Sequence, residues 1–152
     1  MKKLVWILAA LLFWTACERD DLCLEKPAVP LRAAFADDFT GDPKPVTLTV
    51  LYGQDTVLAS QTSDTLDIPL PVDGNSVRYV WIKEDASPPA ADTVEIRYTL
   101  DKQFVSKACG WKTVYKDVDM EVYPGAVSWI KAWEILTAEL TVDTIAHVKI
   151  YH

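Results

Sequence analysis

Residues 93–100 alternate between polar and apolar side chains without a fault. The apolar set is Val94, Ile96, Tyr98 and Leu100. Side chains two positions apart lie on the same face of an extended strand, whereas a helix would scatter them around its axis. One apolar and one polar face are typical of an antiparallel strand that covers a core on one side only. The segment therefore predicts a half-buried β-strand.

Further segments repeat this period of two or carry side chains that favour strands. Residues 46–52 alternate in the same way, and so do residues 145–151. Residues 77–82 have apolar side chains on both faces and are rich in β-forming residues, which predicts a central strand. Most of the chain is thus expected to be extended. The weaker strand candidates are residues 29–35, 56–60, 65–70, 104–109, 111–122 and 127–136.

Turn-forming residues separate the strand candidates. Asp73-Gly74-Asn75 lies between two of them and predicts a hairpin turn, and Pro124-Gly125 predicts another turn. Residues 128–140 are ambiguous, because either an amphipathic helix or a strand would place Trp129 and Trp133 near one face. Nothing caps a helix well there and the neighbouring segments are all strands, so a strand is the preferred interpretation.

Eight to ten strands with turns between them imply an all-β protein. Without helices to carry crossover connections, the sheets should be mainly antiparallel. An immunoglobulin-like β-sandwich of two sheets is the first expectation, and a small closed β-barrel is the alternative. No change of composition marks a second domain, so residues 24–152 are expected to form one domain.

The N-terminus has the layout of a signal peptide for export. Lys2 and Lys3 precede an apolar run over residues 4–14, which is too short to span a bilayer stably. The small residues Thr15-Ala16 and then Cys17 follow directly. This order resembles a bacterial lipobox, in which the thiol of the first mature residue receives a lipid. One position departs from the usual form, since a tryptophan stands three places before the cysteine, where leucine is commonest.

Removal of residues 1–16 would leave Cys17 as the lipid-bearing first residue of a membrane-anchored protein. The alternatives are ordinary secretion, with Cys17 as a structural thiol, and a retained signal anchor. Residues 17–23 are then the anchor and its tether. The expected location is the cell envelope, at the outer membrane, on its periplasmic face or at the cell surface.

The chain is acidic, with 22 Asp and Glu residues against 15 Lys and Arg residues and a net charge of −7. Loss of the two signal-peptide lysines would make this charge more negative. Binding to phosphate backbones needs clustered Lys and Arg side chains. Nucleic acid is therefore excluded as a partner.

Two cysteines besides Cys17 are present, Cys23 and Cys109. Outside the inner membrane such a pair more often forms a disulfide than stays reduced. Closing so long a loop would stabilise the fold by on the order of 4 kcal/mol in the chain-entropy model. The alternative is two unpaired, buried thiols that act as small hydrophobic side chains.

The two cysteine motifs resemble those of a known group of proteins. They are Cys17-Glu18-Arg19-Asp20-Asp21-Leu22-Cys23 and the later Cys109-Gly110-Trp111, which is followed by Tyr115. Together with residues 147–151 they are similar to small lipoproteins of Bacteroidota that are classed as a domain of unknown function. The resemblance implies a lipid-anchored β-domain and transfers no catalytic residue. In that phylum, Arg19-Asp20-Asp21 also loosely resembles a signal for export to the cell surface.

Candidate catalytic and metal-binding residues are few. The histidines are His147 and His152, and a serine or cysteine nucleophile would need one of them as a positioned base. An exposed position on the last strand is the preferred interpretation of His147, and the Cys and His spacings fit no zinc site. Asp37, Asp38 and Asp42 could bind Ca²⁺, but a polar turn is the simpler interpretation. No catalytic residue, metal or cofactor is predicted.

Aromatic residues are the feature that hints at binding. On a strand, Trp129 and Trp133 would share a face and could form an exposed platform for a sugar or a partner protein, although packing in the core is the preferred interpretation. The leading functional hypothesis is a non-enzymatic, lipid-anchored module that binds or scaffolds another envelope component. The alternative is a glycan-binding or glycan-processing accessory lipoprotein, and an enzyme of unidentified type is a third hypothesis.

Overall fold

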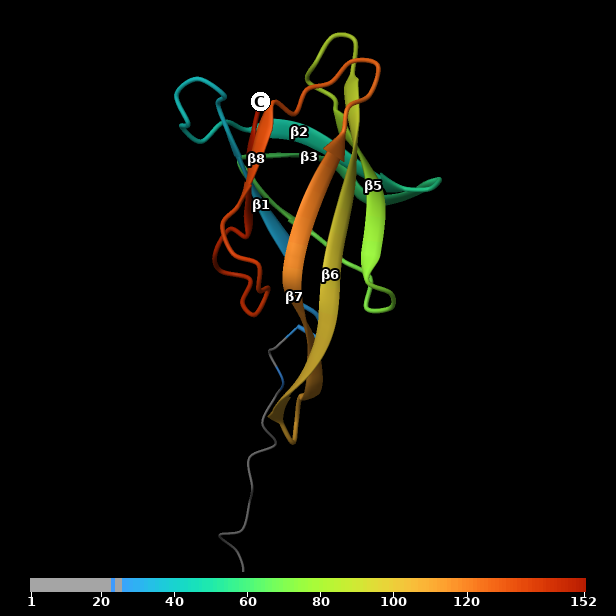
Figure 1. Ribbon diagram of the computed structural model, residues 1–152, viewed down its shortest axis with the longest axis vertical. Helices are drawn as coiled ribbons and strands as arrows, with labels where there is room; N and C mark the ends of the chain where they lie inside the picture. The colour runs from blue at the N-terminus through green and yellow to red at the C-terminus, as the bar shows by residue number, and fades with distance from the viewer. Residues whose placement is uncertain (1–22, 24–25) are drawn as a thin grey trace, which may run out of the picture.

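The computed structural model describes residue 23 and residues 26–152, which form nine strands and no helix (Figure 1). The strands are β1 (Leu31–Ala36), β2 (Val46–Tyr52), β3 (Asp55–Ser63), β4 (Thr65–Ile68), β5 (Ser76–Lys83), β6 (Ala90–Ser106), β7 (Gly110–Tyr123), β8 (Ala132–Ile135) and β9 (Val148–Tyr151). Within this described part, no helix is long and apolar enough to cross a membrane.

The strands form two sheets, in the orders β4-β1-β9-β8 and β3-β2-β5-β6-β7. All pairings are antiparallel except that of β1 with β9, which run parallel. The all-β, mainly antiparallel sandwich predicted from the sequence is thereby confirmed, and the described strands do not close into a barrel. β5 lies at the centre of its sheet, as its apolar composition predicted.

The period-two pattern decides which side chains fill the core. On β6, Val94, Ile96 and Tyr98 are buried as predicted, while Arg97 between them is exposed. The same alternation buries every second residue of β1, β2 and β9 against them. Burying one large apolar side chain stabilises the fold by about 1.5–3 kcal/mol, so a one-residue slip of any strand would exchange core and solvent faces at large cost.

β6 and β7 are much longer than the other strands, with 17 and 14 residues. Their pairing runs from Thr93↔Tyr123 to Ser106↔Gly110, and the hairpin reaches beyond the sandwich, ending at the opposite end of the molecule from the C-terminus (Figure 1). The separate strand predicted over residues 104–109 is therefore wrong. Its first part is the end of β6, and the chain then turns into β7.

The predicted hairpin at Asp73-Gly74-Asn75 is also wrong, because β4 and β5, which flank it, belong to different sheets. Gly74 has a φ of 88°, so the residues do turn the chain, but the turn belongs to a crossing between sheets. Three buried tyrosines hold that crossing by donating their hydroxyls to backbone carbonyls. The pairs are Tyr79 to Pro69 (2.7 Å), Tyr115 to Leu70 (2.9 Å) and Tyr98 to Pro71 (3.1 Å).

The ambiguous segment 128–140 contains only a short strand, β8, flanked by irregular chain. The last strand is likewise shorter than predicted: it begins at Val148, and Ile145 lies outside it and is exposed. In both cases the apolar periodicity continues through residues that lie outside the strands. Hydrogen bonds to buried side chains replace the strand ladder there, as described for Asp92 and His147 below.

Candidate functional site

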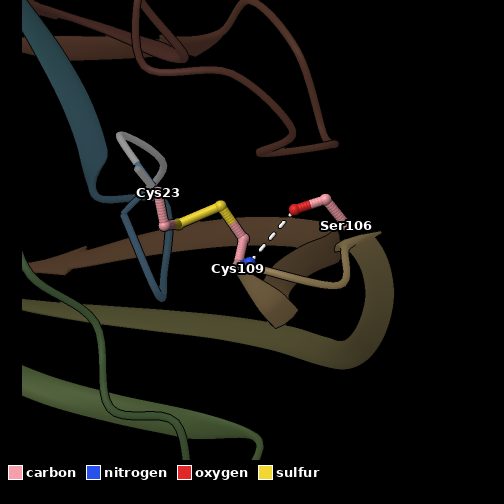
Figure 2. Close-up of a disulfide and its surroundings, with 3 residues drawn as sticks. All are labelled: Cys23, Ser106 and Cys109. Atoms are coloured by element: carbon pink, nitrogen blue, oxygen red, sulfur yellow. Dashed lines mark hydrogen bonds between the residues drawn. A yellow bond between two sulfur atoms is a disulfide. The ribbon is translucent and has the colours of Figure 1, made fainter. Parts of the chain in front are cut away.

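The end of the β6–β7 hairpin carries the predicted disulfide between Cys23 and Cys109, which is confirmed (Figure 2). The Cα atoms of the two cysteines are 4.9 Å apart. The Cys109 N–H also donates to Ser106 Oγ (3.0 Å), and the next residue, Gly110, has a φ of 69°. Glycine adopts this left-handed conformation without steric cost. The turn thus presents Cys109 to the described residues before β1, residue 23 and residues 26–30, hereafter the N-terminal arm.

The arm is attached to the hairpin at further points. The Thr113 N–H donates to the Pro27 carbonyl (2.8 Å), and Ala28 forms a parallel bridge with Thr113. Lys26 of the same segment forms an ion pair with Asp143 (2.7 Å), which lies in the loop before β9 and not in the hairpin. A depression of about 330 Å³ lies between arm and hairpin. Its lining consists of Cys23, Lys26, Pro27, Val105, Cys109, Trp111 and Lys112.

Two large aromatic rings project from this end of the hairpin. Phe104 and Trp111 are cross-strand partners, and their rings meet edge to face with centroids 5.5 Å apart. Phe104 is 57% exposed and Trp111 64% exposed. The hairpin extends beyond the second sheet here, so nothing in the described chain covers the pair. Two adjacent exposed rings make this end of the hairpin a candidate contact surface.

Residues 102–112, hereafter the hairpin tip, are also basic. They include Lys102, Lys107 and Lys112 and no acidic residue, whereas the chain as a whole carries a net charge of −7. The Lys112 ammonium group donates to the Thr141 carbonyl (3.3 Å). An ion pair between Lys116 and Asp101 (2.7 Å) lies where the tip joins the rest of the hairpin. The tip thus combines exposed rings with a local positive charge.

His147 is buried, which corrects the expectation of an exposed strand histidine. Its Nδ1 accepts the Arg32 backbone N–H (2.9 Å), so the ring proton lies on Nε2, which donates to the Val142 carbonyl (2.9 Å). Burial lowers the pKa of His147 below its ordinary value, against the opposing effect of the Val142 hydrogen bond. A neutral ring with both nitrogens engaged is a structural bridge between β1 and the loop before β9.

Trp129 and Trp133 do not form the hypothesised platform. Trp129 is only 5% exposed, and its Nε1–H donates to the Trp81 carbonyl (3.1 Å). Trp133 is 39% exposed on β8, and its Nε1–H donates to the Met120 carbonyl (3.0 Å). The two rings part because residue 129 precedes β8 in an irregular loop. The glycan-binding alternative thereby loses the aromatic platform at Trp129 and Trp133 as support.

Asp92 is the important buried residue that sequence reasoning missed. It is 1% exposed, and its carboxylate accepts backbone N–H groups of Gly125, Trp129 and Ile130, each at 2.9 Å. Burial alone would raise the pKa of Asp92, but these donors outweigh burial and the pKa lies below its ordinary value. The signal was present in the alternation, because position 92 has the same parity as Val94 and therefore faces the core.

The aspartates around Gly41 form a polar turn. The pKa of Asp37 is lowered to about 2 by Lys44, whose Nζ lies 2.9 Å from it, and by the backbone N–H groups of Phe39 and Thr40. Among the described residues, no group of three or more His, Cys, Asp or Glu side chains is gathered closely enough to hold a metal ion. Asp37 is thus engaged by the turn itself.

A surface depression of about 550 Å³ lies where the pairing of β6 and β7 is irregular, beside Asp117. Three of its polar side chains are paired with protein groups: Thr99 Oγ1 donates to Asp117 (3.1 Å), and Arg97 binds Asp119 (2.7 Å) and Glu121 (3.0 Å). Nothing in it combines a nucleophile with a base, so the hairpin tip is the stronger candidate site.

Comparison with known protein families gives a match. A family model described as "Family of unknown function (DUF6452)" matches residues 45–152, which include β2 to β9 and the hairpin tip. No curated protein and no solved structure matches the chain. A family of unknown function was predicted, and this coarser prediction is confirmed. The Bacteroidota lipoprotein origin and the link of the cysteine motifs to it stay predictions, and Cys17 lies outside the described residues. The match covers well over half of the chain, which therefore belongs to the DUF6452 family.

Proposed function

We propose that this protein is a lipid-anchored, non-enzymatic module of the cell envelope that binds or scaffolds another envelope component. The observation that carries the proposal is the placement of Cys23 on the hairpin tip by its disulfide to Cys109. Cys23 is only six residues after Cys17, the expected lipidation site. Six extended residues span at most about 20 Å. A lipid on Cys17 would therefore keep this end of the domain close to the membrane.

The character of the open sheet face also supports a module that acts by binding. On β5, β6 and β7 the outward side chains pair with one another, as in Arg78 with Glu95 (2.8 Å) and Arg97 with Asp119 (2.7 Å). Such a face is polar and well solvated, and it lacks the aromatic strip that sugar binding would favour. This surface therefore favours a binding or scaffolding role over glycan processing.

Metabolic labelling with an alkyne fatty acid tests the anchor. The full-length chain, expressed in a bacterium with a lipoprotein pathway, should take up the label and fractionate with the outer membrane. Cys17→Ala should lose the label, because it removes the only acceptor thiol in the lipobox. Cys23→Ser is the matched control and should stay labelled, since it lies outside that motif. Label that persists on Cys17→Ala, or a wild-type chain that takes up none, would refute the proposal.

Crosslinking in the intact envelope tests the binding role. Treatment of cells with an amine-reactive crosslinker should give a discrete adduct of one size with the wild-type protein, because its exposed lysines lie beside the bound component. The adduct should be absent for Cys17→Ala at equal expression, because that variant is not retained at the membrane. If both the wild type and Cys17→Ala give weak adducts of many sizes and no discrete adduct, the protein has no specific partner and the proposed role is contradicted.

A further inference from the structure

We infer that the hairpin tip docks on the surface of the lipid bilayer, with Phe104 and Trp111 in the headgroup region and the tip lysines against anionic headgroups. The inference rests on the proposed lipid anchor and adds to it a second, non-covalent membrane contact. It assigns a role to the tip that the anchor alone does not require, since a tether could hold the domain in any orientation.

The first argument is positional. The disulfide fixes Cys23 to Cys109, so the short tether begins at the hairpin tip and not elsewhere on the domain (Figure 2). The bridge between Ala28 and Thr113 keeps the following arm on the same strand. The tip is also the far end of the long axis, opposite the C-terminus (Figure 1). Among the described residues, a lipid on Cys17 would therefore hold the hairpin tip, which carries the exposed aromatic pair, near the membrane.

The second argument is chemical. Tryptophan and phenylalanine rings are well suited to the boundary between headgroups and acyl chains, where an apolar body and a polar environment meet. Phe104 and Trp111 are exposed side by side with nothing of the described chain above them. Lysine side chains can lie along such a surface with the ammonium group at the level of the phosphates.

The third argument is charge. A chain with a net charge of −7 is repelled as a whole by anionic lipid, yet residues 102–112 carry three lysines and no acidic side chain. Anionic headgroups attract basic segments that lie within a Debye length of the surface. The positive charge is thus found at the one end of the molecule that the tether brings to the membrane, and it is complementary to a phosphate-rich surface.

Depth-dependent fluorescence quenching tests the docking. The full-length mature lipoprotein is reconstituted into vesicles of phosphatidylcholine and phosphatidylglycerol whose acyl chains carry bromine near the headgroup. Bromine quenches tryptophan only at short range, so bilayer contact should quench Trp111. Trp111→Phe, which keeps an aromatic ring, should lose most of the wild-type quenching. Trp133→Phe, at a partly exposed tryptophan of the other sheet, should retain it.

A charge variant gives a second readout. Lys102→Glu combined with Lys107→Glu leaves both rings in place and should reduce the quenching in vesicles that contain phosphatidylglycerol. Lys131→Glu, an exposed lysine outside the tip, should change nothing. Each of the substituted side chains is wholly or partly exposed, so the fold should persist, which circular dichroism would verify.

The outcomes separate this inference from the proposed function. Protein that fails to float with the vesicles indicates that no lipid is attached, which refutes the anchor and the docking together. Protein that floats without quenching of Trp111 overturns the docking and leaves the anchor standing. The docking is also overturned if Trp111 is shielded from iodide only in native envelopes and not on pure lipid, because a protein partner then covers the tip.

Discussion

Asp92→Ala is expected to lower the free energy of unfolding by about 3–5 kcal/mol, because it leaves three backbone N–H groups without their acceptor, two of them in buried residues. These groups belong to Gly125, Trp129 and Ile130, and they fix the loop that precedes β8. Gly125 packs so closely on Ala91 that even a Cβ would collide with its carbonyl oxygen. Loss of Asp92 should thus release the loop as well as the hydrogen bonds.

Urea unfolding followed by tryptophan fluorescence measures this effect. Asp92→Asn should lose about 2–3 kcal/mol, since an amide fills the space but offers one acceptor oxygen and turns its NH₂ group toward a donor. Asp38→Asn, at an exposed aspartate, is the matched control and should stay within about 0.5 kcal/mol of the wild type. An Asp92→Ala protein as stable as the control would show that the carboxylate contributes nothing to the fold.

The same carboxylate makes stability depend on pH. Because the folded pKa of Asp92 lies below its ordinary value, the folded state binds fewer protons than the unfolded state in acid. The stabilisation is fully present above the unfolded pKa of about 4 and is lost as pH falls through the folded pKa. Asp92→Asn should therefore lose less stability than the wild type on acidification, measured as the difference between their unfolding free energies at each pH.

Removal of the disulfide is expected to cost a comparable amount, about 4 kcal/mol in the chain-entropy model. The two cysteines are 86 residues apart in sequence, so the crosslink restricts a large part of the unfolded chain. The double variant Cys23→Ser, Cys109→Ser avoids a leftover thiol that could pair wrongly. The wild type, when unfolded in the presence of a reductant, should have the same free energy of unfolding as this double variant.

Denaturant unfolding of the double variant and of the oxidised wild type gives the comparison. The variant should unfold at lower urea concentration, and the sandwich should still form, because its core does not depend on the arm before Ala28. The tip aromatics should remain exposed in both proteins. Equal midpoints for variant and wild type would mean that the backbone bonds between arm and hairpin already restrain this end, and that the disulfide adds nothing to stability.

Local periodicity predicted the strands well where the backbone is extended. Residues 93–100 gave the correct inward face of β6, and residues 46–52 that of β2, because alternation depends only on neighbouring residues. What it could not give is which strands pair. The turn residues at 73–75 were recognised, but whether they close a hairpin depends on the sheet to which each flanking strand belongs, and this is decided by distant segments.

In the candidate site, too, some features could be predicted from the sequence and others depend on contacts between distant segments. The disulfide could be inferred from cysteine number and compartment, and it is present. Trp129 was placed beside Trp133 on the assumption of continuous extension, which the hydrogen bonds to Asp92 override. Asp92 was not predicted, although it has the same parity as Val94 and therefore faces the core. The exposed pair at Phe104 and Trp111 could not be predicted, because it depends on the cross-strand register of β6 and β7 and on the extension of this hairpin beyond the sandwich.

The parallel pairing of β1 with β9 has a consequence for the timing of folding. It joins residues 33–36 to residues 148–151. β1, the first described strand to be synthesised, therefore lacks one of its two neighbours until β9, the last described strand, is made. Such long-range pairing delays folding. In a chain exported across a membrane, as the N-terminal sequence predicts, the four-stranded sheet would therefore close only after the C-terminal segment had followed the rest through.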